Sequence, residues 1–104
     1  MANGLRNMMK EAQKLEKRLA AVREKLSTMT VEGSAGGGAV TATMNGQRDV
    51  TAIVVDAEVL EGGDTSMLED LLLSALREAK RKSDELAATE MAKVTGMAMP
   101  PGSF

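Results

Sequence analysis

The 104-residue sequence lacks cysteine, histidine, tryptophan and tyrosine, and its only phenylalanine is the last residue. Without cysteine the chain has neither disulfides nor thiol chemistry. Without histidine it lacks the commonest general base and the commonest metal ligand. Because aromatic residues are scarce, the apolar content is aliphatic and includes nine methionines. Stability must therefore come from long helix contacts or from an oligomer interface.

Long apolar runs are also missing. The first residues, Met-Ala-Asn-Gly-Leu-Arg, contain no apolar stretch of the kind that signal peptides have. No segment approaches membrane-spanning length. We therefore expect a cytoplasmic protein without a membrane partner, built as a single domain over residues 1–104. Residues 97–104 are expected to form a loose tail because they contain Pro100-Pro101-Gly102.

Apolar residues near the start of the chain recur at alternating spacings of three and four. This is the a/d pattern of a coiled-coil seam, and it predicts a helix from about Leu5 to Leu26 that packs along another long helix. Asn3 is expected to cap this helix. The seam consists of Leu5, Met8, Ala12, Leu15, Leu19, Val22, Leu26 and Met29.

Three β-rich stretches follow, at residues 28–32, 39–44 and 48–55. The glycine-rich residues 33–38 predict a flexible connection between the first two stretches. Asn45-Gly46 predicts a tight hairpin with positive φ at both turn positions. The three stretches therefore predict an antiparallel meander, after which Asp56 is expected to cap a helical turn through Leu60.

A second long helix is predicted from Ser66 to about Val94, because Ser66 and Glu69 have the spacing of a capping box and a broad apolar face follows. At about 1.5 Å per residue it is on the order of 40 Å long, too long for its own sheet to cover. The expected fold is α+β with the order α-β-β-β-α, a small three-stranded antiparallel sheet flanked by two long helices. The seam of the first helix can pair with the second helix or with another chain, and the sequence leaves both open.

Neither of the two motifs that suggest chemistry supports an enzyme. The loop at residues 33–38 lacks the Gly-Lys-Ser/Thr ending of a phosphate-binding loop and precedes a strand. The carboxylates between Glu58 and Asp70 lack the alternating spacing of a calcium loop. We therefore expect no catalytic residue, no metal site, no cofactor and no small-molecule substrate.

Positive charge is concentrated at the start of the chain. Residues 1–27 carry seven bases against three acids, whereas residues 28–70 carry one base against eight acids. A row of cations on a rigid helix suits the phosphates of a nucleic-acid duplex, although an ordinary solvated helix face explains it equally well. The lack of aromatic residues disfavours single strands. The bases that lie opposite the seam are Arg6, Lys10, Lys14 and Lys17, and a second cluster contains Arg77, Lys80, Arg81 and Lys82.

In four stretches the sequence resembles the YbaB/EbfC family of bacterial nucleoid-associated proteins. The first stretch is MMKEAQKL at residues 8–15, and the second runs from VEG through GGGAV to NG within residues 31–46. The third contains VD, VL and MLEDL within residues 55–71. The last contains M, VTGM and PPG within residues 91–102. The resemblance implies a tweezer-like homodimer in the nucleoid that binds double-stranded DNA with little sequence preference. It also implies DNA contacts from both terminal helices, which we assign to Arg6, Lys10, Lys14, Lys17 and, more weakly, to Arg77, Arg81 and Lys82.

The sequence departs from the family pattern where Thr41 replaces a frequent lysine and where the tail ends at Ser103-Phe104 without a further lysine. Both departures remove positive charge, so weak, salt-sensitive DNA binding is expected. The alternative function is a protein-interaction or chaperone-like clamp, because two long helices around a small sheet are also similar to prefoldin subunits. Apolar residues clustered at the helix tips would favour the clamp, and a charged helix exterior would favour DNA.

Overall fold

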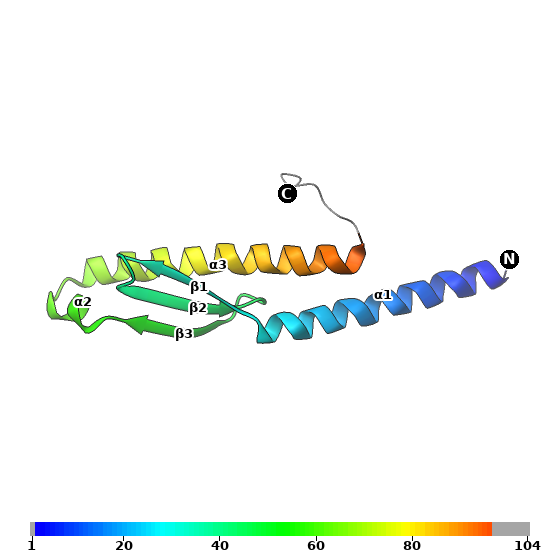
Figure 1. The fold of residues 1–104 in the computed structure, drawn as a ribbon, viewed down its shortest axis with the longest axis horizontal. Helices are drawn as coiled ribbons and strands as arrows, with labels where there is room; N and C mark the ends of the chain where they lie inside the picture. Colours follow the sequence, from blue (N-terminus) through cyan, green and yellow to red (C-terminus); the bar gives the residue numbers. More distant parts are fainter. Residues whose placement is uncertain (1, 97–104) are drawn as a thin grey trace.

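The computed structural model describes residues 2–96 and contains three helices and three strands (Figure 1). In chain order they are α1 (Ala2–Thr28), β1 (Thr30–Ala35), β2 (Val40–Asn45), β3 (Val50–Val55), α2 (Ala57–Glu61) and α3 (Thr65–Thr95). The strands form one antiparallel sheet in the order β1-β2-β3. The expected architecture is therefore confirmed, with α2 as the helical turn after Asp56, but the Asp56 side chain accepts no capping hydrogen bond there. The tail expected at residues 97–104 lies outside the described residues.

Helix α3 covers one face of the sheet, mainly over β1 and β2. Ala75, Ala79 and Ser83 follow one another at a spacing of four, which places them on one side of the helix, and all three are fully buried. Gly33 of β1 lies beneath them, and a Cβ atom there would collide with the backbone of Ala75 and Ala79. Small side chains and one glycine thus bring the helix backbone directly against the strand.

This close approach corrects one prediction. Residues 33–35 belong to β1 and not to the flexible loop that the glycine-rich sequence predicted. Gly33 has a packing role within the strand, and the turn itself uses Gly36, Gly37 and Gly38, which all have positive φ.

The hairpin between β2 and β3 forms at Asn45-Gly46 as predicted, but with a different conformation. The residue with positive φ is Arg48 (φ 66°), while the Asn45 side chain accepts hydrogen bonds from the backbone N–H groups of Gln47 and Asp49. Gly46 is needed for close approach, because a Cβ there would lie 2.7 Å from Leu26 Cδ2. Because this loop is longer than two residues, it does not need positive φ at both turn positions, as a two-residue hairpin does.

Helices α1 and α3 run antiparallel and share only part of their length (Figure 1). Val22 and Leu26 of the α1 seam are buried and Leu19 is partly buried, while residues 3–18 are exposed. The first half of α1 extends past the end of α3, so the described residues measure 73 × 26 × 17 Å. The seam therefore pairs within the chain only in its second half.

The helix starts differ from the predictions by one to three residues. Asp64, and not Ser66, caps α3, and its side chain accepts a hydrogen bond of 2.9 Å from the backbone N–H of Met67. Asn3 lies within α1, which begins at Ala2. A carboxylate three residues before an unpaired N–H group is an effective cap, so Asp64 takes the role assigned to Ser66.

The packing at Gly33 makes a testable prediction. Replacing Gly33 with alanine should lower the free energy of unfolding by about 3 kcal/mol or more, because the new Cβ would push α3 off the sheet. Urea unfolding followed by circular dichroism measures this change. Gly4→Ala is the matched control, since Gly4 lies in α1 with open space around it and should leave stability equal or slightly higher. Equal stability of the two variants would contradict the close approach of α3 to β1.

Candidate nucleic-acid interface

Three of the cations predicted on the first helix form a row on α1, here called the α1 ridge: Arg6, Lys10 and Lys17. At about 100° per residue, their side chains emerge within about 40° of one another, on the side of α1 opposite Val22 and Leu26. All three are exposed, and none of them makes a salt bridge within residues 2–96. The ridge spans roughly 16 Å along the helix at 1.5 Å per residue. It is thus a rigid set of cations open to a partner.

Lys14, the fourth predicted cation of α1, emerges about 40° beyond Lys10, toward the seam. Its ammonium group is 3.6 Å from Glu11 in a salt bridge. It also lines a shallow groove at the end of α3, together with Glu11, Leu15, Arg18, Val94 and Thr95. Arg18, which the sequence reasoning did not select, is exposed at this groove, and its position beside the seam was the available signal.

The cations predicted on α3 differ in whether they already have a partner within the described residues. Arg81 is held between two carboxylates, with Nη2 2.7 Å from Glu78 and Nη1 2.6 Å from Glu85. The hydrogen bond from Arg81 holds the pKa of Glu78 below its ordinary value. Lys82 donates a hydrogen bond of 2.8 Å to the backbone carbonyl of Glu32 on β1. Of the three residues assigned on α3, Arg77 alone is exposed without a salt bridge inside the described range.

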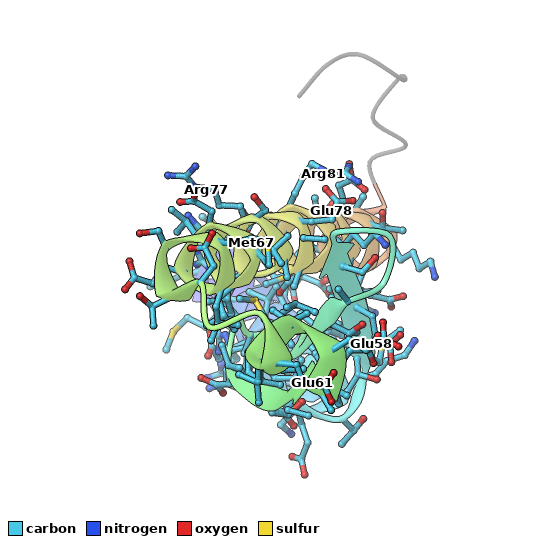
Figure 2. All side chains as sticks on the ribbon, turned by 90° about the vertical axis from the view of Figure 1, so that its left-hand side faces the viewer. Glu58, Glu61, Met67, Arg77, Glu78 and Arg81 are labelled. Atoms are coloured by element: carbon cyan, nitrogen blue, oxygen red, sulfur yellow. The ribbon has the colours of Figure 1, made fainter. Side chains whose placement is uncertain are left out.

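The two predicted clusters face different sides of the chain. Figure 2 shows Arg77 and Arg81 on the outer surface of α3, away from the sheet. The α1 ridge points away from α3, because the α1 side that contacts α3 is the one opposite the ridge. A single protomer therefore does not bring the α1 and α3 cations onto one surface.

An ionic interaction that the sequence reasoning missed holds α1 against α3. The carboxylate of Glu90 is buried and accepts hydrogen bonds of 3.0 Å from Lys25 of α1 and from Lys93. These two lysines lower the pKa of Glu90. The pairing of Glu90 with Lys93 follows from helical spacing, but Lys25 is 65 residues away and the sequence gives no signal for it. This interaction helps to fix the direction in which the α1 ridge points.

Charge is polarised along the molecule. Glu58 and Glu61 lie in α2, at the end opposite the N-terminus of α1 (Figures 1 and 2). The cation-rich half of α1 forms the other end of the 73 Å long axis. An anionic partner is therefore attracted to the free end of α1 and repelled from the α2 end.

Two apolar surfaces remain uncovered by the rest of residues 2–96. One is the first half of the α1 seam, where Leu5 is 64% and Met8 70% exposed. The other is β3, where Ile53 is 41% and Val54 62% exposed. Soluble monomers rarely expose apolar groups in clusters of this kind, so both surfaces mark contact sites.

Other kinds of site find little support in the described residues. Between residues 2 and 96, no group of three or more acidic side chains is placed to hold a metal ion. The same part of the chain contains no helix that is both long and apolar enough to cross a membrane.

The sequence matches the YbaB/EbfC DNA-binding family over residues 1–98. The chain belongs to this family. It is 44% identical over 101 residues to a nucleoid-associated protein of Acetivibrio thermocellus, covering 96% of this chain and 89% of that protein. It is also 44% identical over 91 residues to one of Chloroflexus aurantiacus, covering 88% of this chain and 91% of that protein. The resemblance seen in the sequence is thus confirmed, and the family is one of DNA-binding proteins and not of enzymes.

The fold also has a match among solved structures. An uncharacterized protein from Helicobacter pylori superimposes with a TM-score of 0.77, covering 86% of this chain and 94% of that one. Its sequence is 21% identical to this chain, so the match supports the family fold alone. The residues assigned to DNA contact stay predictions.

The pairing of Glu90 predicts a pH effect on stability. Because its pKa is lowered in the folded chain, its contribution is full above the unfolded value of about 4.3 and is lost as the pH falls through the folded value. Glu90→Gln should therefore be less stable at pH 7 and should lose less further stability than the native chain on acidification. Urea unfolding at about pH 7 and at about pH 3.5 measures both changes.

Glu24→Gln provides the control, because Glu24 is an exposed acid of α1 with no salt bridge inside the described range. This variant should keep the native stability and the native pH dependence. A Glu90→Gln variant with the native pH dependence would contradict the assigned role of Glu90.

Proposed function

We propose that this protein binds double-stranded DNA in the nucleoid, and hence in the cytoplasm, as a homodimer that contacts mainly backbone phosphates with little sequence preference. The observation that carries the proposal is the α1 ridge, a row of cations without salt bridges on a helix that extends beyond the body of the chain. Membership of a DNA-binding family, and relatives named nucleoid-associated proteins, support it.

Backbone binding suits the chemistry of the ridge. Lysine and arginine neutralise phosphates without reading base edges, and such binding weakens steeply with salt. The chain has a formal net charge of −2, and its acidic α2 end adds repulsion, so we expect weak binding that is strongest at low salt. Of the α3 cations, Arg77 is the best placed to bind a further phosphate, because Arg81 and Lys82 already have partners.

The homodimer is supported by the uncovered strand β3. The register pairs Val40 with Val55 and Ala42 with Ile53, so Val55 and Ile53 point to the same face of the sheet as the core. Helix α3 packs mainly over β1 and β2 and leaves this part of the face open. Among the described residues, no strand lies beside the outer edge of β3. An apolar edge strand that is open on both faces is a ready site for a second copy of the chain.

A second candidate function is the protein-binding clamp, which the exposed apolar side chains at the free end of α1 favour. The charged row on the same helix favours DNA. A DNA titration separates the two functions, because a clamp without a DNA function would not bind a duplex through the α1 ridge.

The α1 ridge can be tested by neutralisation. Lys10→Gln combined with Lys17→Gln should weaken the binding of a DNA duplex roughly tenfold at about 50 mM salt. The slope of log affinity against log salt should fall by about 0.9 for each phosphate that the variant no longer neutralises. Fluorescence anisotropy titrations at several salt concentrations measure both quantities.

Arg23→Gln combined with Arg48→Gln is the matched control. It removes the same number of positive charges, but from exposed residues that are not assigned to DNA contact and whose carboxylate partners lie within the chain. This control should bind DNA within about twofold of the native chain, since exposed ion pairs add little to stability or to long-range attraction. An equal weakening of binding in the two double variants would show that net charge, and not the ridge, determines binding.

The dimer surface makes a further prediction. Ile53→Lys should shift the chain from dimer to monomer, because a charged side chain would be buried on the uncovered face of β3. Size-exclusion chromatography with light scattering measures the molar mass. Ser74→Lys is the control, since Ser74 is exposed on the outer side of α3. The molar mass of this variant in solution should equal that of the native protein. A native chain that is monomeric at all concentrations would contradict the homodimer.

A further inference from the structure

The first half of the α1 seam is an apolar surface that has no partner within residues 2–96. Leu5, Met8, Ala12 and Leu15 continue the heptad pattern of the buried residues, yet all four are exposed. The partner helix α3 ends at Thr95, beside Leu15, where the shallow groove described above opens. The seam thus continues beyond the helix that covers its second half.

The spacing of this free seam specifies the kind of partner. A strict alternation of three and four fits the side of another long helix and not an irregular segment. Residues 97–104 include Pro100 and Pro101, and proline inside a helix removes a hydrogen bond and clashes with the preceding turn. Helix α3 is already engaged, so the remaining long helix with a free seam is α1 of another copy.

We propose that the free ends of α1 from two homodimers pair as a short antiparallel coiled coil, and that this pairing lets the protein hold two DNA duplexes together. The DNA-holding part of this proposal rests on the proposed function. The pairing itself depends on the seam alone and does not require DNA.

The register of this pairing follows from the free residues. When residue numbers of facing positions add up to 20, Leu5 faces Leu15 of the other copy and Met8 faces Ala12, which gives four layers in total. The two neighbouring antiparallel registers fit less well. A shift by seven residues in one direction leaves only Leu5 facing Met8, and a shift in the other direction requires Val22, which α3 already covers.

Flanking charges favour the antiparallel over the parallel arrangement. In a parallel pair, Glu11 at a g position would face Glu16 at an e position on both sides of the seam. In the antiparallel pair, one flank joins the two Met9 side chains and the other brings the two Glu11 carboxylates together. The antiparallel pair thus has one contact between like charges, where the parallel pair has two.

Helix ends also match in the antiparallel arrangement. The incoming α1 would continue the line of α3 along the same side of α1, with its N-terminus next to the C-terminal end of α3 at Thr95. The N-terminus of a helix carries partial positive charge and the C-terminus partial negative charge, so this junction is favourable.

The pairing would place the DNA-binding surfaces on opposite sides. Each α1 ridge points away from its own seam, so two helices joined by their seams present their ridges outward in opposite directions. Four apolar layers make a small interface, so the association should be weak in solution. Binding to the same DNA raises the local concentration of the ends and strengthens the association.

Engineered cysteines test the register directly, because the native chain has none. Met8→Cys and Ala12→Cys chains are prepared separately, mixed at high concentration and oxidised mildly. The expected result is a mixed disulfide that forms faster than either symmetric disulfide and joins homodimers into species with the mass of four chains or more. A Lys17→Cys chain, with its cysteine on the opposite side of α1, should not crosslink. Fastest crosslinking between two Met8→Cys chains would overturn the antiparallel register.

A charge-neutral variant tests the consequence for DNA. Leu5→Ser combined with Met8→Ser should bind a single duplex as the native chain does, but its capture of a second, labelled duplex by bead-bound DNA should fall at least fivefold. Asn3→Ser combined with Asn7→Ser, on exposed positions outside the seam, should retain the capture. Capture that persists in the Leu5/Met8 variant would overturn the bridging role.

The remaining outcomes are distinguishable. If the native chain bound no DNA but formed the mixed disulfide, the proposed function would fail and the pairing would stand. If a chain with both Met8→Cys and Met99→Cys formed a disulfide within itself and stayed a dimer, residues 97–104 would occupy the seam and the pairing would be overturned. A molar mass that stays that of a dimer at millimolar concentration, without any mixed disulfide, would also overturn it.

Discussion

The turn at Asn45-Gly46 is the feature on which the arrangement of the helices depends. The N–H of Gly46 donates hydrogen bonds of 2.8 Å to the carbonyl of Leu26 and 3.0 Å to that of Met29, so the hairpin closes the C-terminal end of α1. The hydroxyl of Ser83, fully buried in α3, donates a hydrogen bond of 2.8 Å to the carbonyl of Asn45. One turn thus joins the sheet to both long helices, and the absence of a side chain at Gly46 makes this possible.

Because α1 is held only in its second half, its first half carries two free surfaces. The turn, the buried Val22 and Leu26, and the ion pair between Lys25 and Glu90 all lie in the second half. The first half therefore presents cations on one side and an apolar seam on the other. A helix that is free along both sides can bind an anionic duplex and a second protein chain at the same time, and the proposed function and the proposed pairing use these two sides separately.

Ion pairing within the chain decides which cations remain open to a partner. Arg81, Lys25 and Lys93 each contact a carboxylate of α3, and Lys82 contacts a backbone carbonyl. Lys25 joins α1 to α3 and Lys82 joins α3 to β1, whereas the partners of Arg81 and Lys93 lie within α3 itself. The α1 ridge has no acid of α3 beside it, because it lies on the side of α1 opposite the one that contacts α3. The distribution of free positive charge is thus a consequence of which side of α1 packs against α3.

The sequence by itself determined the order of elements, the antiparallel meander and the cation row on α1, because these depend on local periodicity and turn chemistry. It also identified the family. Only the tertiary structure decided that Gly33 lies inside a strand, that Arg81 and Lys82 have partners, and that α3 covers half of the seam. These features depend on atoms brought together from distant parts of the chain, such as Lys25 and Glu90, and local patterns carry no information about such distances.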